Sequence, residues 1–342
     1  MSATANGRAG TAAPVAPVNR VIAPLPLFDP AAGTTVIEPL GSGPGWWAGA
    51  PGAYWTGDRF YLVYRLRRPQ PQRGGETHIA VSDDGEHFET IWTAQKDDFN
   101  SPSIERSALL RTDEGRWRLY VSYVDGADGR WRIDLLEADA PEHFDAATRV
   151  PVLTAADIQA EGIKDPYVCR VGGEWHMFAS YAPTPEALLA NESREDAQAK
   201  MHGTRDIYNT GTSKSLTGLA TSVDGRRWQW EGPILEPRDG AWDAYAARLN
   251  SVVWRPPVWF GYYDGSASVA ENYEERCGAV YSFDLRHWRR LSLDGPALGA
   301  AGGPGSVRYV EAVQGSDWIR YFYEWTRPDG AHELRTILRR EA

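Results

Sequence analysis

The stretch GIKDPYVCRVGGEWHMFASY, residues 162–181, contains two runs of alternating apolar and polar residues on either side of Gly172 and Gly173. Alternation with a period of two is typical of β-strands, and paired glycines favour a tight hairpin turn. A further run, TGLATS at 217–222, has the same character. The stretch therefore predicts an antiparallel hairpin that continues into a larger sheet.

This arrangement recurs five times along the chain. The aromatic-rich runs are TGDRFYLVYR (56–65), DEGRWRLYVSY (113–123), GGEWHMFASY (172–181), RPPVWFGYYDG (255–265) and GSDWIRYFYEW (315–325). In four copies a later polar turn leads to an aromatic residue, namely Phe88, Phe144, Trp228 or Trp288. A two-sheet sandwich explains the alternation but not five similar hairpins in one internal order. The repeat predicts an all-β fold, a five-bladed β-propeller with about four strands in each blade.

The two ends of the chain complete this prediction. The fifth copy runs out of residues before an outer strand, so we expect an N-terminal segment such as Arg20–Phe28 to supply that strand and protect the sheet edge. Residues 1–19 are small, polar and Pro-containing, which predicts a disordered lead-in. Residues 20–342 are then one propeller domain.

An insert interrupts the third blade at residues 182–215. Within it, Thr184 as N-cap, Pro185 at the first helical position and Gly203 as a stop predict one helix. The insert joins the second and third strands of its blade, like the other long connections. We therefore expect it at the rim that carries these connections, as a partial lid over an axial pocket.

Composition excludes several classes of function. The net charge of −10 argues against a nucleic-acid partner, which needs a basic surface. No run approaches 18 apolar residues, so we expect no membrane-spanning segment. Cys169 and Cys277 form no C-x-x-C pair and predict free thiols of a cytoplasmic protein. The 15 Trp and 16 Tyr residues suit an aromatic-rich β protein that binds flat ligands.

Charged residues interrupt the apolar strands that we expect at the propeller axis. They are Glu105, Arg106, Lys164, Asp165, Arg248, Arg308 and Glu311. Buried charges are costly unless they are paired or solvated. Structural ion pairs between blades explain any single one of them. Because the whole set falls at corresponding positions around one axis, it favours a functional site instead. In such a site, neighbouring charges shift the pKa values of carboxylates.

The sequence Lys-Asp-Pro-Tyr-Val (164–168) at the head of the third unit resembles the glycosidase superfamily that contains glycoside hydrolase families 43, 32 and 130. In that pattern an Asp-Pro precedes a Gly turn and an aromatic strand, matched here by Asp165-Pro166, Gly172-Gly173 and Trp175. The resemblance covers about Trp46 to Leu338. It implies a carbohydrate substrate and cleavage of a glycosidic bond by paired carboxylates.

The chain also departs from this pattern. The resemblance implies an aspartate at the head of the first blade and a glutamate in the fourth. The spacing between Asp165 and Trp175, counted back in those blades, gives Ala50 and Ala247 instead. The usual triad is therefore incomplete.

The sequence supports the following site. We expect Asp165 to orient or tune the other groups, with Glu105 and a glutamate of the loop AENYEERCG, Glu274, as further catalytic carboxylates; Glu271, Glu275 and Glu311 are alternatives. The expected substrate-binding residues are Trp46, Trp47, Arg106, Lys164, Arg248, Arg308 and Glu271. Trp46 and Trp47 fit sugar stacking and core packing equally well.

Three functions remain open at this point. The first is a glycoside hydrolase acting on a small or modified, possibly anionic, saccharide. The second is a phosphate-dependent glycoside phosphorylase, whose arginines would hold phosphate. The third is a non-catalytic sugar-binding propeller, favoured by Ala50. The seven histidines show no metal-binding spacing and no phosphate loop is present, so no metal or other cofactor is expected. The sequence leaves the oligomeric state undetermined.

Overall fold

The predicted hairpin at residues 162–181 is confirmed. The computed structural model describes residues 25–186, 190, 193–300 and 304–340. In it, β10 (Gly162–Val171) and β11 (Glu174–Ala182) pair antiparallel through a turn at Gly172 and Gly173. Both glycines have positive φ, 61° and 89°, which residues with a Cβ rarely adopt. β12 (Leu216–Ser222) and β13 (Gln229–Leu235) continue the sheet.

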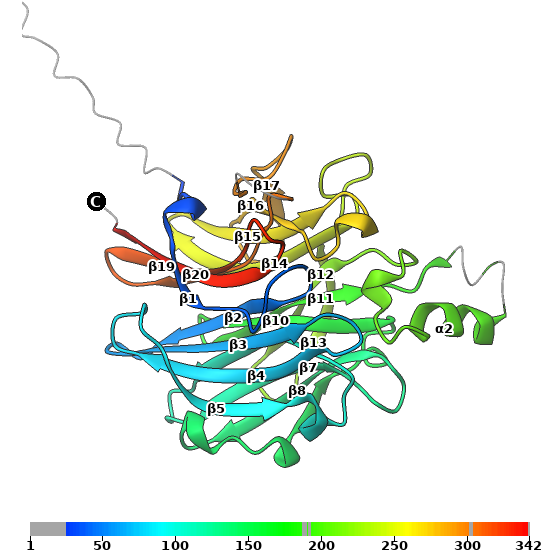
Figure 1. Cartoon of the computed structure of the whole chain (residues 1–342), viewed down its shortest axis with the longest axis horizontal. Coiled ribbons are helices and arrows are strands. Elements are labelled where there is room, and N and C mark those ends of the chain that lie inside the picture. The colour runs from blue at the N-terminus through cyan, green and yellow to red at the C-terminus, as the bar shows by residue number, and fades with distance from the viewer. Residues whose placement is uncertain (1–24, 187–189, 191–192, 301–303, 341–342) are drawn as a thin grey trace, which may run out of the picture.

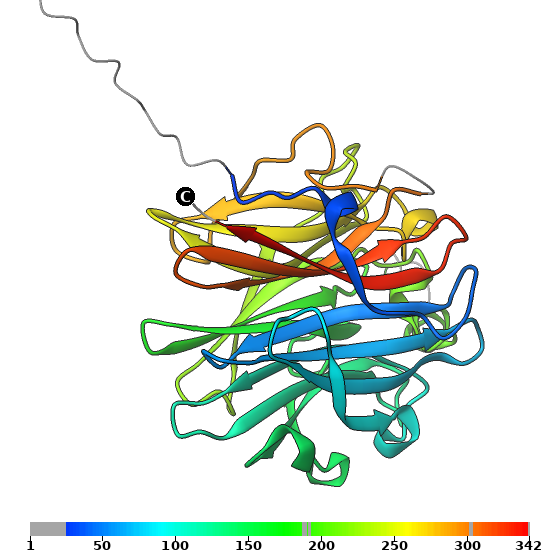
Figure 2. The same ribbon diagram turned by 60° about the vertical axis from the view of Figure 1, so that its left-hand side comes forward.

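The described chain repeats this four-stranded antiparallel unit five times (Figures 1 and 2). The first unit comprises β2 (Trp47–Trp55), β3 (Phe60–Arg68), β4 (Arg73–Ser82) and β5 (Glu89–Gln95); the second comprises β6 (Ile104–Arg111), β7 (Trp117–Val124), β8 (Trp131–Ala138) and β9 (Val150–Leu153). The fourth comprises β14 (Ala246–Arg255), β15 (Val258–Ser266), β16 (Arg276–Ser282) and β17 (Trp288–Arg290); the fifth comprises β18 (Val307–Gln314), β19 (Trp318–Thr326), β20 (His332–Arg340) and β1 (Thr34–Ile37). The structure is all-β, as predicted.

An N-terminal strand completes the fifth unit, as expected, but from a later segment than Arg20–Phe28. β1 pairs antiparallel with β20, with Thr34 opposite Thr336. Phe28 instead stacks on the ring of Tyr321 with centroids 4.3 Å apart. The short apolar segment before β1 is thus used for packing, and the backbone pairing falls to the β-branched run that follows. The predicted lead-in, residues 1–19, lies outside the described residues.

The aromatic residue after the polar turn joins each of the first four units to the unit before it, with the fifth preceding the first. Phe88 meets Phe322 of the fifth unit, Phe144 meets Trp92, Trp228 meets Tyr120 and Trp288 meets Phe178, with ring centroids 5.8–6.2 Å apart. These are the four aromatics that follow the repeated polar turn in the sequence. The repeat therefore encodes the packing between units as well as the strands within them.

Three of these polar turns share one side-chain arrangement. Ser82, Ser222 and Ser282 donate from their hydroxyls to Asp84, Asp224 and Asp284, 2.9–3.1 Å away. Each aspartate also accepts backbone N–H groups two and three residues later, an arrangement that stabilises the turn. These hydrogen bonds hold the pKa of each aspartate below its ordinary value.

The first strands of the five units are neighbours in a closed cycle. β2 contacts β6, β6 contacts β10, β10 contacts β14, β14 contacts β18, and β18 contacts β2. Each of these strands has a β-bulge or irregularity near its start. At the bulge, Ala50, Asp165 and Tyr309 have φ values of 52°, 54° and 53°, which is strained for residues other than glycine.

The described α-helix of the insert is α2 (Arg194–His202), and the short 3-10 helix η5 (Ile207–Asn209) follows it within the insert. Other short 3-10 helices lie outside the insert, at η1 (Pro30–Ala32), η2 (Lys96–Phe99), η3 (Pro141–His143), η4 (Ala146–Thr148) and η6 (Val269–Glu271). Ser193 caps α2 by accepting from the N–H of Asp196, and Gly203 ends the helix as predicted. Thr184 does not cap α2, because α2 begins only at Arg194. The hydroxyl of Thr184 donates to Glu161. Ala197 and Met201 anchor α2 on Trp131 and its neighbours, outside the sheets (Figure 1).

Within the described residues, no helix has the length and apolar character needed to cross a bilayer. Cys169 and Cys277 are both free, as expected.

Candidate functional site

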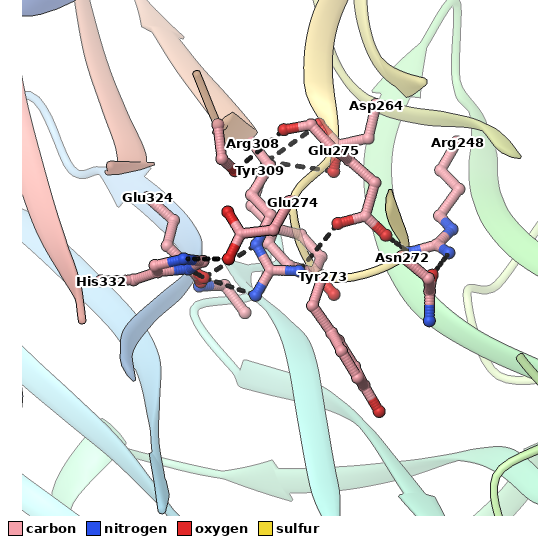
Figure 3. A network of polar contacts seen from close by, with 12 residues as sticks. Arg248, Asp264, Asn272, Tyr273, Glu274, Glu275, Arg308, Tyr309, Glu324 and His332 are labelled. Atoms are coloured by element: carbon pink, nitrogen blue, oxygen red, sulfur yellow. Dashed lines mark hydrogen bonds and ion pairs between the residues drawn. The ribbon is translucent and has the colours of Figure 1, made fainter. Parts of the chain in front are cut away.

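Buried charges of alternating sign form a continuous chain at the starts of the first strands. Its members, in order of contact, are Arg67, Glu105, Arg65, Glu324, Arg308, Glu275 and Arg248, each at most 3% exposed. The N–O distances along it run from 2.5 to 3.4 Å. Figure 3 shows the part from Glu324 to Arg248. We call these seven residues the charge chain.

Opposite neighbours keep the carboxylates of the charge chain ionised. Burial opposes the charge of Glu275, yet Arg248 and Arg308 lower its pKa to about 2. Burial likewise opposes the charge of Glu105 and Glu324, but the paired arginines hold the pKa of both well below the ordinary value. Because each carboxylate is ionised and paired, these three groups stabilise positive charge but do not donate protons.

Asp165 lies beside this chain, in the bulge of β10. Its carboxylate is 3.4 Å from Nζ of Lys164 and accepts hydrogen bonds from the backbone N–H of Arg106 and the hydroxyl of Tyr309, at 3.3 and 3.4 Å. The residue is 2% exposed. Lys164 and Arg106, both predicted as substrate-binding residues, therefore contact Asp165, Lys164 through its side chain and Arg106 through its backbone.

The bulges show which positions correspond between units. The N–H of Ala50, Asp165 and Tyr309 donates in each case to a second strand of the preceding unit, to Glu324, Ser122 and Asp264 respectively. Ala50 is thus the counterpart of Asp165, as the sequence count indicated. In the fourth unit the spacing predicted Ala247 as the corresponding residue. This prediction is wrong, because the irregularity of β14 falls between Leu249 and Ser251.

Asp264 is a site residue that the sequence did not reveal. It is fully buried, and it accepts from the amide of Asn250 at 2.6 Å and from the N–H of Tyr309 at 3.1 Å. Burial, together with the nearby charge of Glu275, raises the pKa of Asp264 to about 7. Its position inside an aromatic strand, YYDG at 262–265, gave no signal apart from its own charge.

Glu274 and His332 extend the cluster towards the surface. His332 Nδ1 is 2.7 Å from Glu324, and its Nε2 is 3.2 Å from Glu274 (Figure 3). The Glu274 side chain is 28% exposed, whereas His332 is fully buried. Sequence reasoning selected Glu274 but not His332, because no metal-like spacing marks this histidine.

The remaining predicted binding residues are placed differently from one another. Trp47 is 5% exposed, stacks on His332 with centroids 4.8 Å apart and faces the guanidinium of Arg308, so it packs inside the protein. Trp46 lies against Gly41, outside the charge chain. Glu271 pairs with Arg276 at 2.8 Å and makes no contact with the charge chain.

The connection between β15 and β16 covers the charge chain. Asn272 accepts from Arg248 at 2.7 Å, and the Tyr273 hydroxyl lies 3.2 Å from Arg67 and 3.0 Å from Asp206 of the insert. Tyr273 itself has a φ of 83°. In this conformation two connections meet over the site and close it.

An open cavity of about 420 Å³ lies at the opposite end of the first strands. Arg106 and Glu311, which form an ion pair, line it together with Tyr167, Cys169 and Trp175. Burial raises the pKa of Glu311 to about 7 even though Arg106 opposes this shift. The ends of the first strands and the tight-turn residue Asp113 line this cavity, so it lies at the tight-turn end and not at the rim of the long connections, where the axial pocket was expected.

Among the residues with described positions, no cluster of three or more His, Cys, Asp or Glu side chains is arranged to hold a metal.

Comparisons with known proteins identify the fold. Neither a family model nor a curated protein sequence matches the chain. Among solved structures, a glycoside hydrolase matches at 14% identity and TM-score 0.64, over 91% of this chain and 92% of its own. The chain has the fold of this glycoside hydrolase. A β-1,2-mannobiose phosphorylase from Listeria innocua, at 14% identity, has a TM-score of 0.56 over 90% and 94% of the two chains. A thermostable family-43 glycoside hydrolase, at 13% identity, has a TM-score of 0.54 over 86% and 89%.

Proposed function

We propose that this protein is a glycoside hydrolase, and that its five units are the blades of a five-bladed propeller with the site at the long-connection end of the axis. The closed cycle of first strands supports the propeller. One observation carries the function: the strained bulge of β10 directs the buried carboxylate of Asp165 to Lys164 and Tyr309, in a fold shared with glycoside hydrolases and a phosphorylase.

Glycoside cleavage needs one group that protonates the leaving oxygen and one carboxylate that supports the developing positive charge or activates water. Glu105, which stays ionised between Arg65 and Arg67, suits the second task. Glu274 is not locked in an arginine pair and has solvent access, which suits the first. Asp165 positions Lys164 and Tyr309 and tunes the field between them.

The charge chain favours hydrolysis over phosphorolysis. Arg65, Arg248 and Arg308 are each bound to a carboxylate, so none is a free cation for inorganic phosphate. A small saccharide fits this site better than a polymer, since Asn272 and Tyr273 must move before any substrate enters. The insert contributes through Asp206, which binds Tyr273, and we include it in the proposal as a partial lid. A cytoplasmic location, with both cysteines reduced, completes the proposal.

A second candidate is a non-catalytic sugar-binding protein. Ala50 favours it, because the position that corresponds to Asp165 in the first unit carries no carboxylate. Both candidates bind a sugar, but only the hydrolase cleaves it.

The test is a panel of aryl glycosides and short oligosaccharides, assayed with and without phosphate. We expect the wild type to release sugar without phosphate and Asp165→Asn to lose this activity while keeping its circular dichroism and melting temperature. Asp113→Asn, an exposed aspartate at the tight-turn end paired with Arg170, is the matched control. Cleavage that requires phosphate would favour a phosphorylase. Binding without cleavage would establish the second candidate, and full activity of Asp165→Asn would remove Asp165 from the mechanism.

A further inference from the structure

His332 is held between two carboxylates that differ in their access to solvent. Its Nδ1 faces Oε1 of Glu324 at 2.7 Å, and its Nε2 faces Oε1 of Glu274 at 3.2 Å. Trp47 covers one face of the imidazole, with ring planes 19° apart. The Thr326 hydroxyl, 3.1 Å from both Nε2 and Glu274, fixes the second contact further. Figure 3 shows the imidazole between the two carboxylates.

The surroundings determine where the protons are. Glu324 is ionised because Arg308 binds it through Nε at 2.8 Å and Arg65 approaches it at 3.4 Å. An ionised carboxylate only accepts hydrogen bonds, so Nδ1 of His332 must carry hydrogen. A contact between Nε2 and Glu274 then needs one proton, because two acceptors do not attract each other. That proton resides either on Nε2 or on Glu274.

Only one end of this arrangement reaches solvent. The side chains of His332 and Glu324 are both 0% exposed, while that of Glu274 is 28% exposed. The charged groups that face His332 are Glu324 from β19, with Arg308 behind it, and Glu274 from the covering connection; Glu333, next to it in β20, turns to Arg335 instead. The shared proton therefore leaves and returns through Glu274.

We propose that His332 is a positioning residue that keeps a proton available on Glu274, which donates it to the leaving group. This inference rests on the proposed hydrolase function. Glu274 gives the proton to the glycosidic oxygen as the bond between that oxygen and the anomeric carbon breaks, with the electron pair passing to the oxygen. The oxygen of a water molecule then bonds to the anomeric carbon. One proton of this water stays on the new hydroxyl group, and the other returns to the Glu274–His332 pair. Glu324 stays ionised throughout and holds the imidazole in one tautomer.

Substrates with two kinds of leaving group test this step. The dinitrophenolate group of a dinitrophenyl glycoside leaves without being protonated. The methoxy group of a methyl glycoside of the same sugar must be protonated as it leaves. We expect Glu274→Gln and His332→Asn to lower kcat for the methyl glycoside about 100-fold or more, and kcat for the dinitrophenyl glycoside less than about 3-fold. In both variants, the decline of kcat for the methyl glycoside at alkaline pH should also disappear. Glu333→Gln, which removes a neighbouring carboxylate that does not face His332, is the control and should behave as the wild type.

A second measurement does not depend on turnover. In protein labelled with ¹⁵N-histidine, the Nε2 resonance of His332 should change in Glu274→Gln and stay unchanged in Glu333→Gln. If the Nε2 resonance of His332 is unchanged in Glu274→Gln, His332 and Glu274 do not share a proton and the proposal is wrong. Equal losses with both leaving groups in His332→Asn reduce His332 to a structural residue and overturn the proposal. A wild type that cleaves neither glycoside overturns the hydrolase function, and with it this use of the proton.

Discussion

The backbone N–H of Ala50 donates a hydrogen bond to Oε2 of Glu324, 3.1 Å away, and this bond joins the first unit to the fifth. The same carboxylate binds Arg308, Arg65 and His332. Glu324 is therefore both a link between units and the centre of the charge chain. A fold that closes on itself through a buried carboxylate depends on that carboxylate for stability as well as for any chemistry nearby.

Glu324→Gln should destabilise the protein by about 3–5 kcal/mol, because Arg308 and Arg65 lose their shared counter-charge in a buried place. Urea unfolding followed by tryptophan fluorescence measures this change. Glu38→Gln, which removes an exposed partner of Arg327, should change stability by less than about 0.5 kcal/mol. A loss below about 1 kcal/mol for Glu324→Gln would show that the arginines find other partners.

Gly49→Ala tests the space beside the same carboxylate. A Cβ on Gly49 would lie 1.8 Å from Oε2 of Glu324, so the side chain must move and weaken its bonds to Ala50 and Arg65. We expect a loss of about 1–3 kcal/mol in unfolding free energy. Gly295→Ala, at a position with nothing within 4 Å, is the control. Equal stability of the two variants would contradict the close packing at Gly49.

Asp264 makes stability depend on pH. Burial raises its pKa to about 7 in the folded protein, so the folded state holds a proton that the unfolded chain releases near pH 4. The favourable contribution of this proton is complete below about pH 4 and is lost as pH rises to about 7, at no more than about 1.4 kcal/mol per pH unit.

Asp264→Asn should therefore flatten the decline in unfolding free energy between about pH 4 and pH 7. Denaturant titrations at several pH values measure the slope. Glu311, whose pKa burial also raises to about 7, leaves part of the slope in place. An unchanged slope in Asp264→Asn would mean that this carboxyl is ionised in the folded protein.

A chain that begins at Glu38 lacks β1 and exposes the edge of β20. It also loses the contacts of Phe28 with Tyr321 and of the Pro30 carbonyl with Tyr323, 2.6 Å away. We expect a lower melting temperature and concentration-dependent association, because an unpaired strand edge recruits other chains. The comparison is a chain that begins at Leu25. Identical melting and size-exclusion profiles would show that β1 does not stabilise the fifth unit.

The local structure follows from the sequence because its causes are local. Alternation around Gly172 and Gly173 predicts β10 and β11, and the turns at Asp84, Asp224 and Asp284 hold themselves with their own backbone. Repetition of these signals predicts the five units. The exact strand that completes the fifth unit did not follow, because both segments before β2 contain apolar residues and only packing against Tyr321 distinguishes them.

The partners of the charged residues were decided by the tertiary structure alone. Sequence marked Glu105 and Arg308 as unusual in apolar strands, but each has a partner from another unit: Arg65 from the first for Glu105, and Glu275 from the fourth for Arg308. Arg308 also pairs with Glu324, which lies opposite it in its own hairpin. His332 and Asp264 carry no sequence pattern at all. Charges act through space over a few ångströms, so their pairing depends on which strands the closed cycle brings together, and alternation within one strand contains no information about that.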